Sequence, residues 1–230
     1  MPRLDKVNRR YVLKKLVFGV IVLAGTVWLF LNFNRGKRYI SRILEPKERK
    51  PLTVVEIVKR TQNNYGEDIE KLAREFNVPS NYLKALIVLE VGGRKPAPTR
   101  FEKGVFQKLK LVKEGKRKRY EKVKKKTIAN ASEDALKNLA TSWGAFQIMG
   151  YKCVQLGVNV SDIRGERSLY WGVKWISEEY GKYLRKGKFK DGFHIHNAGS
   201  KYPRNGKPRT YHADYVPNGL KYMDMFDQIS

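Results

Sequence analysis

The stretch "YLKALIVLEVGG", Tyr82 to Gly93, is apolar on most sides and ends on a carboxylate followed by two glycines. Its pattern predicts the second half of a short buried helix. A charge is costly at the buried end of such a helix, because the carboxylate loses its water. Burial favours the protonated form and raises the pKa of Glu90, so this carboxyl can keep a proton near neutral pH. A protonated carboxyl is what a general acid needs when the leaving group is a sugar oxygen.

The two glycines after Glu90 have two interpretations. Gly92 and Gly93 remove side chains next to the carboxyl, which lets a bulky substrate approach the backbone closely. The plainer alternative is that the acid and the glycines simply end a helix. These residues alone leave both interpretations open.

The chain from Thr53 onward has a helical pattern, and the predicted fold class is mainly α. Thr53 is a cap-like residue ahead of apolar residues at helical spacing. Residues 67–90 predict two helices broken at "NVPS", with Ser80 as the N-cap of the second. Ser132 is the expected cap of a short helix over "SEDALKNLA".

Two further helical segments lie toward the C-terminus. Residues 167–187, "RSLYWGVKWISEEYGKYLRKG", predict one longer helix whose recurring aromatic residues pack in the core. Residues 212–229, "HADYVPNGLKYMDMFDQI", predict a final helix interrupted by Pro217. We find no convincing strand alternation and no repeat in the sequence.

The composition restricts the partners of the protein. The 230-residue chain has 48 Lys and Arg against 22 Asp and Glu, a formal charge of +26. So basic a protein associates with nucleic acid, anionic lipid head groups or anionic cell-wall polymers, and the charge does not choose among them. The single cysteine, Cys153, cannot form an internal disulfide and is expected in the core.

The N-terminal residues predict a membrane anchor. Residues 16–31, "LVFGVIVLAGTVWLFL", carry no charge, and Phe33 extends them toward the roughly 20 apolar residues of a bilayer span. A signal peptide is the rival, but "FLNFNRGKRY" offers no small-x-small cleavage site. Basic residues flank both sides, so the positive-inside rule does not settle orientation. We expect a basic leader over 1–15, an uncleaved transmembrane anchor over 16–33, a basic linker over 34–52 and a folded domain over 53–230.

One segment of that domain stands apart by its charge. Lys103–Lys126, "KGVFQKLKLVKEGKRKRYEKVKKK", holds 12 basic and two acidic residues. It could contact a membrane or another polyanion, because a block of like charge attracts any nearby anionic surface. The alternative is a solvated loop or hairpin inserted into a helical domain.

Several motifs resemble the lysozyme-like enzymes that cleave peptidoglycan. "SWGAFQIMGYKCVQLG", Ser142 to Gly157, resembles the "SWGLFQIMG" signature of N-acetylmuramidases and corresponds to the "GLMQI" motif of lytic transglycosylases. "NVPSNYLKALIVLEVGG" resembles the helix that carries their catalytic glutamate. Three weaker blocks follow the family's order: "RFEKGVFQKL" resembles its "FE-x-x-x-F" segment, "HIHNAGSKY" its "YNAG" motif and "YHADYVPNGLKY" its "YV-x-x-V" segment. Together the blocks cover roughly residues 67–222.

The resemblance implies a lysozyme-like domain and assigns roles to individual residues. It makes Glu90 the general acid, places Tyr215 near it as an orienting group, and has Asn197 hold the cleft and contact substrate. Structural hydrogen bonding inside a helical core remains the alternative for Tyr215 and Asn197.

The "SWGAFQIM" block supplies the remaining implied cleft residues. Gln147 would hydrogen-bond the glycan, although structural hydrogen bonding is again the alternative. Gly144 would allow close approach of a sugar ring, and Phe146 and Met149 would shape the cleft wall.

The chain also departs from the family pattern. Val91 stands where many relatives have Ser, and His196 replaces the usual Tyr before "NAG". His194 and His196 offer two nitrogens to a metal, but no third ligand is evident, and we expect no metal or other cofactor.

Two mechanisms are open for Glu90. In one, the muramyl C6 hydroxyl of the substrate attacks and yields a 1,6-anhydro product without a second carboxylate. In the other, a second carboxylate activates water, at roughly 6.5–9.5 Å from the acid in an inverting enzyme. Glu102 is the best candidate for that carboxylate, although it could equally pair with Arg100.

Two function classes follow from these observations. The first is a membrane-anchored glycosidase, a lytic transglycosylase or muramidase, that cleaves the MurNAc–GlcNAc β-1,4 bond of peptidoglycan. Its N-terminus would lie on the cytoplasmic side of the membrane and its catalytic domain on the cell-wall side. The second is a catalytically inactive lysozyme-like protein that binds nucleic acid or anionic lipid through its basic segments. The chain has no G-x-S-x-G, H-E-x-x-H or Walker-type motif to suggest other chemistry.

Overall fold

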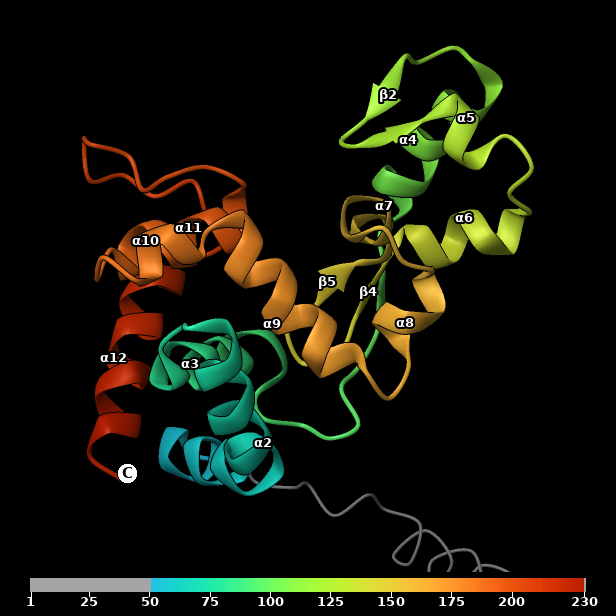
Figure 1. The fold of residues 1–230 in the computed structure, drawn as a ribbon. Helices are drawn as coiled ribbons and strands as arrows, with labels where there is room; N and C mark the ends of the chain where they lie inside the picture. Colours follow the sequence, from blue (N-terminus) through green and yellow to red (C-terminus); the bar gives the residue numbers. More distant parts are fainter. Residues whose placement is uncertain (1–50, 230) are drawn as a thin grey trace, which may run out of the picture. The chain divides into compact units, whose positions relative to one another are not determined.

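The computed structural model describes residues 51–229, which from Leu52 onward belong to one compact unit (Figure 1). The predicted leader and anchor, and the predicted linker up to residue 50, lie outside the described residues. Among the residues that are described, no helix is long and apolar enough to cross a bilayer.

The described residues are mainly helical, which confirms the predicted mainly α class. The helices are α2 (Val54–Phe76), α3 (Ser80–Val91), α4 (Lys103–Glu114), α5 (Lys125–Ile128), α6 (Glu133–Leu139), η1 (Gly150–Lys152, a 3-10 helix), α7 (Cys153–Leu156), α8 (Val160–Arg164), α9 (Ser168–Glu179), α10 (Gly181–Leu184), α11 (Phe189–Ala198) and α12 (Tyr215–Asp227).

Short strands accompany these helices, which the sequence did not predict. β1 (Arg100–Phe101), β4 (Thr141–Trp143) and β5 (Ile148–Met149) form an antiparallel sheet in the order β1-β4-β5. β2 (Arg119–Tyr120) and β3 (Val123–Lys124) form a separate hairpin. Strands of two or three residues are too short to show an alternating pattern in the sequence.

The helix starts were predicted with mixed success. Thr53 caps α2 in a reciprocal capping box with Glu56, and the Ser132 hydroxyl accepts a hydrogen bond from the Ala135 amide at the start of α6. The prediction for Ser80 is wrong, because Pro79 is the cap residue of α3 and Ser80 is already its first helical residue. Pro79 brings the chain into the helix in an extended conformation without any side-chain hydrogen bond.

Two predictions about the C-terminal helices are also wrong. The single helix expected over 167–187 breaks between α9 and α10 at Tyr180, whose φ of −142° and ψ of 7° are not helical. The break directs the Tyr180 ring into the core, where the residue is fully buried. Pro217 does not interrupt α12, because it is the third residue of that helix, where a backbone N–H has no partner within the helix.

Helix α3 lies at the centre of the main hydrophobic cluster. It packs against α2 and α12, and every residue from Tyr82 to Val88 is buried (Figure 1). Fully buried aliphatic side chains such as Leu83, Leu86 and Ile87 each contribute about 1.5–3 kcal/mol. This packing makes α3 a rigid support for its last turn, which carries Glu90.

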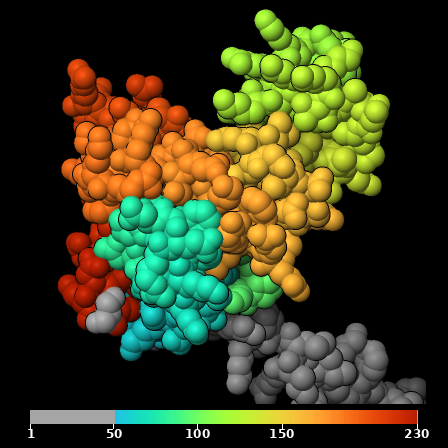
Figure 2. All heavy atoms as spheres, in the orientation of Figure 1, coloured from blue at the N-terminus to red at the C-terminus, as the bar shows by residue number. Residues whose placement is uncertain are grey.

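A second hydrophobic cluster supports the basic segment Lys103–Lys126. Its buried residues come from the region between α4 and α8, and Phe106, Leu109, Val112 and Val123 are contributed by the basic segment itself. The segment is therefore a folded helix and hairpin, not a solvated loop. Figure 2 shows the surface hollowed between this part, in green, and the part that contains α10 and α11, in orange.

The glycines after Glu90 have a structural reason in the described fold. Gly92 and Gly93 have φ values of +56° and +70°, which favour glycine. A Cβ on Gly93 would lie 2.9 Å from the backbone nitrogen of Thr61, and the Gly92 carbonyl accepts a hydrogen bond from Arg60 Nε at 3.0 Å. The two glycines thus end α3 and turn the chain tightly against α2.

Candidate active site

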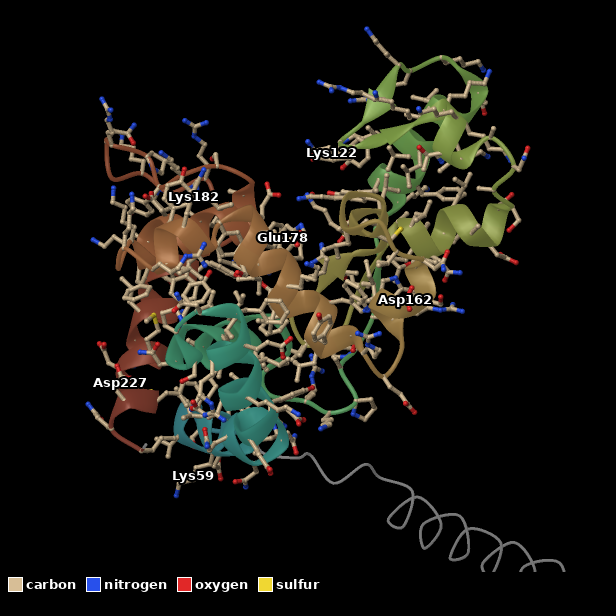
Figure 3. All side chains as sticks on the ribbon, viewed as in Figure 1. Lys59, Lys122, Asp162, Glu178, Lys182 and Asp227 are labelled. Carbon is tan, nitrogen blue, oxygen red and sulfur yellow. The ribbon has the colours of Figure 1, made fainter. Side chains whose placement is uncertain are left out.

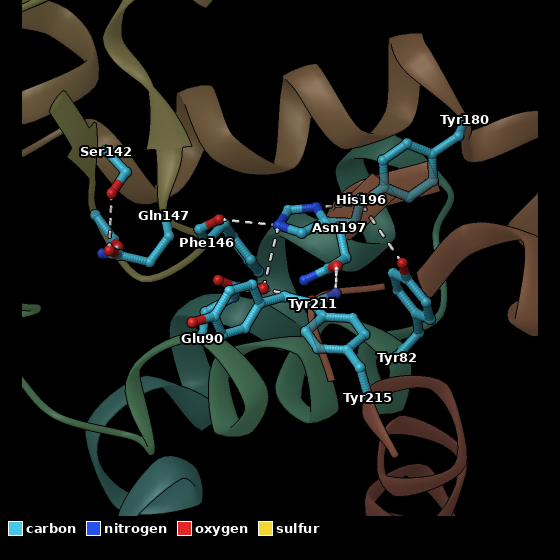
Figure 4. Close-up of polar contacts among 11 residues, drawn as sticks. Tyr82, Glu90, Ser142, Phe146, Gln147, Tyr180, His196, Asn197, Tyr211 and Tyr215 are labelled. Carbon is cyan, nitrogen blue, oxygen red and sulfur yellow. Dashed lines mark hydrogen bonds and ion pairs between the residues drawn. The ribbon is translucent and has the colours of Figure 1, made fainter. Parts of the chain in front are cut away.

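Glu90 is a buried carboxyl with a tyrosine hydroxyl as hydrogen-bond donor. It lies in the last turn of α3, its side chain is 17 % exposed, and Tyr215 donates a hydrogen bond to Oε1 (Figure 4). Burial raises the pKa of Glu90 from its ordinary value of 4.5 to about 7, while the Tyr215 hydrogen bond and the positive charge of Arg100 lower it. Near neutral pH, this carboxyl can both give and take a proton.

Tyr215 and Asn197 form one connected unit beside that carboxyl. Tyr215 is the first residue of α12, and burial followed by the charge of Glu90 raises the pKa of its hydroxyl well above the ordinary value. It therefore remains a donor. A side-chain hydrogen bond from Asn197 lowers the pKa of the Tyr215 hydroxyl. Asn197 Oδ1 also accepts a hydrogen bond from the Tyr211 backbone N–H at 3.0 Å. Asn197 itself is exposed, so it is also open to a ligand.

His196 lies next to the same oxygen of Glu90 that Tyr215 contacts. Its side chain is 6 % exposed, and Nε2 lies 3.7 Å from Glu90 Oε1. Burial is the main cause that lowers the pKa of His196 to about 4, so the ring is neutral at physiological pH and the contact is not an ion pair. Sequence reasoning singled out His196 only as a departure from a motif and as one of two possible metal ligands.

A cavity of about 360 Å³ is lined by His196 and Asn197, the neighbours of Glu90 and Tyr215, but not by Glu90 or Tyr215 themselves. Three residues that the sequence assigned to the cleft, Gln147, Met149 and Asn197, line it together with His196. Its other lining residues include Ile148 and Trp175 of the main cluster, Tyr151 of the second cluster and Glu121 of the β2–β3 turn. The cavity is large enough to accept part of a polymeric ligand beside His196 and Asn197, which contact Glu90 and Tyr215.

The side chain of Gln147 has partners within the protein. Its Nε2 donates to the Pro98 carbonyl at 2.8 Å and to the Gly144 carbonyl at 3.0 Å, and its Oε1 accepts from the Ser142 hydroxyl at 3.0 Å. Gln147 also has a φ of +48°, so it is part of a tight turn between β4 and β5. These contacts favour the structural interpretation, in which Gln147 holds the hairpin against the loop before β1.

Two cleft assignments need correction. The side chain of Phe146 is not on a cleft wall, because the residue is 1 % exposed and its ring packs in the main cluster against Gly172. Gly144 does not border the cavity that His196 and Asn197 line but a second one, of about 340 Å³. Its φ is +70°, and a Cβ there would lie 3.2 Å from Ser168 Cβ, so the turn and this packing account for the glycine without a sugar ring.

Glu102 has an ion-pair partner. Arg100 Nε lies 2.7 Å from Glu102 Oε1, and Glu102 is the N-cap residue of α4. The same Arg100 acts electrostatically on Glu90, a role that sequence reasoning missed. The "RFE" block contained the arginine, but nothing in the pattern indicated that its charge reaches the acid.

The aromatic residues behind the site were also missed. Tyr180 and Trp175 contact His196 directly, Tyr180 through a hydrogen bond and both through edge contacts of the rings, and Tyr82 lies behind Tyr180. The recurring aromatic residues of 167–187 predicted only core packing, and Trp175 and Tyr180 are indeed buried. Within residues 51–229 there is no group of three or more His, Cys, Asp or Glu side chains arranged to hold a metal ion.

No protein-family model, curated protein or solved structure matches this chain. A function for this site therefore has to be argued from its own residues and their geometry.

Proposed function

We propose that the chain is a peptidoglycan-cleaving glycosidase with a lysozyme-like domain, acting on the MurNAc–GlcNAc β-1,4 bond with Glu90 as general acid and base. The observation that carries the proposal is the Glu90 carboxyl itself, buried at the end of an apolar helix, with a pKa of about 7 and a hydrogen bond from Tyr215. A cavity lined by His196, whose Nε2 lies 3.7 Å from Glu90 Oε1, leaves room for a glycan. The order of the sequence motifs supports the same enzyme class.

The chemistry begins with protonated Glu90. Its proton passes to the glycosidic oxygen, the C1–O bond breaks, and the bonding electron pair stays on that oxygen. The ionised Glu90 then takes a proton from the hydroxyl that attacks C1. We favour the muramyl C6 hydroxyl as attacking group, which gives a 1,6-anhydro product, because the carboxylate of Glu102 is occupied by Arg100. Hydrolysis by water is the alternative, and the products distinguish the two.

The proposal includes the location of the enzyme. Residues 16–33 would anchor the chain in the cytoplasmic membrane with the N-terminus inside, and residues 53–230 would face the cell wall. Protease added to intact spheroplasts should degrade the catalytic domain. Protection of that domain until the membrane is permeabilised would contradict this topology.

We expect Tyr215→Phe to lower the rate of glycan cleavage about tenfold at pH 7. The hydroxyl donates to Glu90, and a hydrogen bond to a charged group contributes about 1.5–3 kcal/mol. Its loss disfavours the anion that Glu90 becomes, so the pKa of Glu90 rises and the alkaline limb of the rate profile moves to higher pH. Steady-state cleavage measured from pH 5 to 9 tests this. An unchanged alkaline limb would show that Tyr215 does not act on the acid.

A second candidate function, polyanion binding, is favoured by the surface of the basic segment Lys103–Lys126. Its two acidic residues already have cationic partners: Glu114 lies 2.9 Å from Lys116, and Glu121 lies 3.8 Å from Lys152. The lysines of the β2–β3 hairpin and of α5 are exposed, as Figure 3 illustrates for Lys122. Binding of this kind is compatible with catalysis and does not require it.

Charge reversal in the segment tests polyanion binding without deleting buried residues. We expect simultaneous replacement of Lys118, Lys122, Lys124 and Lys126 by Glu to weaken binding to single-stranded DNA. The slope of log K against log salt should become shallower by roughly three, if each lysine contacts one phosphate. The control replaces four exposed lysines elsewhere, Lys59, Lys71, Lys182 and Lys221. Equal losses in both variants would mean that only the net charge matters.

A further inference from the structure

A buried hydrogen-bond chain fixes the tautomer of His196. The Tyr180 hydroxyl lies 2.8 Å from Nδ1 of His196, and the Tyr82 hydroxyl donates to the Tyr180 oxygen at 3.5 Å (Figure 4). Tyr82 and Tyr180 are fully buried. The Phe146 carbonyl, 3.0 Å from Nε2, can only accept a hydrogen bond, so the proton of the neutral imidazole lies on Nε2. Nδ1 is then an acceptor, and Tyr180 donates its own proton to it.

Nε2 of His196 faces two oxygen atoms. It lies 3.0 Å from the Phe146 carbonyl, a hydrogen-bond distance, and 3.7 Å from Glu90 Oε1. While Glu90 is protonated, the Phe146 carbonyl is the natural acceptor for the Nε2 proton. When Glu90 loses its proton, a full negative charge appears next to that N–H. A hydrogen bond to an ionised acceptor is about twice as strong as a neutral one, so the two acceptors then compete.

We propose that His196 is a positioning residue of this site. Tyr180 holds the imidazole ring at Nδ1, and the neutral Nε2–H group changes its acceptor from the Phe146 carbonyl to the Glu90 carboxylate when Glu90 protonates the glycosidic oxygen. The inference rests on the proposed function. The transferred proton goes from Glu90 to the leaving oxygen, and His196 keeps its own proton throughout. Its contribution is a hydrogen bond that forms as the negative charge develops, which is where an enzyme stabilises a transition state most effectively.

The other charged and titratable groups around the pair do not replace this donor. Glu90 is faced by Tyr215 of α12, which already donates to it, and by Arg100 of β1. The Arg100 side chain is 68 % exposed and pairs with Glu102, so water and salt screen its charge. Lys152 lines the same cavity as His196, and its positive charge disfavours the imidazolium. His196 therefore acts as a neutral donor.

The test compares His196→Phe, which removes the donor, with His196→Gln, whose amide can still donate. For His196→Phe we expect kcat to fall about tenfold or more and the alkaline limb of the pH profile to move up by about one unit, as loss of a hydrogen bond to a charged group predicts. His196→Gln should recover most of the rate and the normal limb. Tyr180→Phe removes the hydroxyl that donates to Nδ1 and helps to fix the tautomer of His196. It should also move the alkaline limb to higher pH, but by less than His196→Phe does.

His194 provides the matched control on the same helix. It is fully buried, but Nδ1 lies 2.6 Å from the Ser200 carbonyl and Nε2 accepts the Arg209 amide at 2.9 Å, so it holds the loop after α11. His194→Gln should lower thermal stability and leave the alkaline limb in place. If His196→Phe behaves in the same way, or if His196→Gln is as impaired as His196→Phe, His196 has only a structural role and the inference fails.

A second measurement separates the inference from the proposed function. The pKa of Glu90 can be followed in the full-length protein by the carbon-13 chemical shift of its carboxyl, without any cleavage. It should rise by about one unit in His196→Phe relative to wild type and stay close to wild type in His196→Gln. If the wild-type protein cleaves no glycan but His196→Phe still raises the pKa of Glu90, the proposed function is wrong and the His196–Glu90 coupling stands. If the wild-type protein cleaves glycan but His196→Phe leaves the pKa of Glu90 unchanged, the proposed function stands and the inference fails.

Discussion

Glu90→Gln should cleave purified peptidoglycan sacculi about 10²–10⁴-fold more slowly than the wild-type full-length protein, the range that general acid catalysis contributes. The amide cannot protonate the glycosidic oxygen. It can still accept the hydrogen bond from Tyr215, so the surrounding contacts are largely kept. The released muropeptides are counted by mass spectrometry. The same assay from pH 5 to 9 should show wild-type cleavage falling about tenfold per pH unit above about 7, where Glu90 loses its proton.

The products of the same digestion decide the mechanism. Anhydro-muropeptides from the wild-type protein alone would establish a lytic transglycosylase that uses Glu90. Reducing-end products would indicate hydrolysis and a second carboxylate, and Glu102→Gln should then be nearly inactive. In a transglycosylase, Glu102→Gln should retain most activity, because its carboxylate only pairs with exposed Arg100. A Glu90→Gln protein as active as wild type would exclude Glu90 as the acid. No cleavage by either folded protein would favour polyanion binding.

The part of the site that could be predicted lies in continuous, strongly patterned sequence. The apolar run that ends in Glu90 and two glycines already implied a buried carboxyl, and burial raises its pKa as expected. The short helix capped by Ser132 and the helical class follow equally local rules. These features depend on neighbours along the chain, which a single sequence displays directly.

The unpredicted part depends on contacts between distant residues. The turn at Tyr180 looks like the interior of a helix in the sequence, but its ring packs against Tyr82 and His196, which come from other helices. Arg100 reaches Glu90 through folding of β1 next to the end of α3. The motif resemblance implied that the Gln147 amide binds the glycan, whereas its partners are the carbonyls of Pro98 and Gly144, backbone groups that no sequence pattern identifies.

The same Glu90→Gln change should stabilise the protein at alkaline pH. The folded state binds the Glu90 proton more tightly than the unfolded state does, with pKa values of about 7 and 4.5. Between these values the folded state holds more protons, so stability falls as pH rises from about 4.5 to 7, by about 3 kcal/mol in all. Glutamine does not titrate and avoids this loss. The two proteins should be equally stable near pH 4.5, and the variant should gain about 3 kcal/mol by pH 8.

Thermal unfolding of the two full-length proteins at pH 4.5 and pH 8 measures this difference. A gain of about 3 kcal/mol corresponds to a rise in Tm of roughly 6–12 °C for a folded unit of this size. Glu102→Gln is the matched control, because that carboxyl is part of an exposed ion pair, and its effect should stay within about 1 kcal/mol at both pH values. If Glu90→Gln has the same Tm as wild type at pH 8, the folded protein does not hold Glu90 protonated at neutral pH. The general-acid role would then lose its physical basis, whatever the cleavage assay shows.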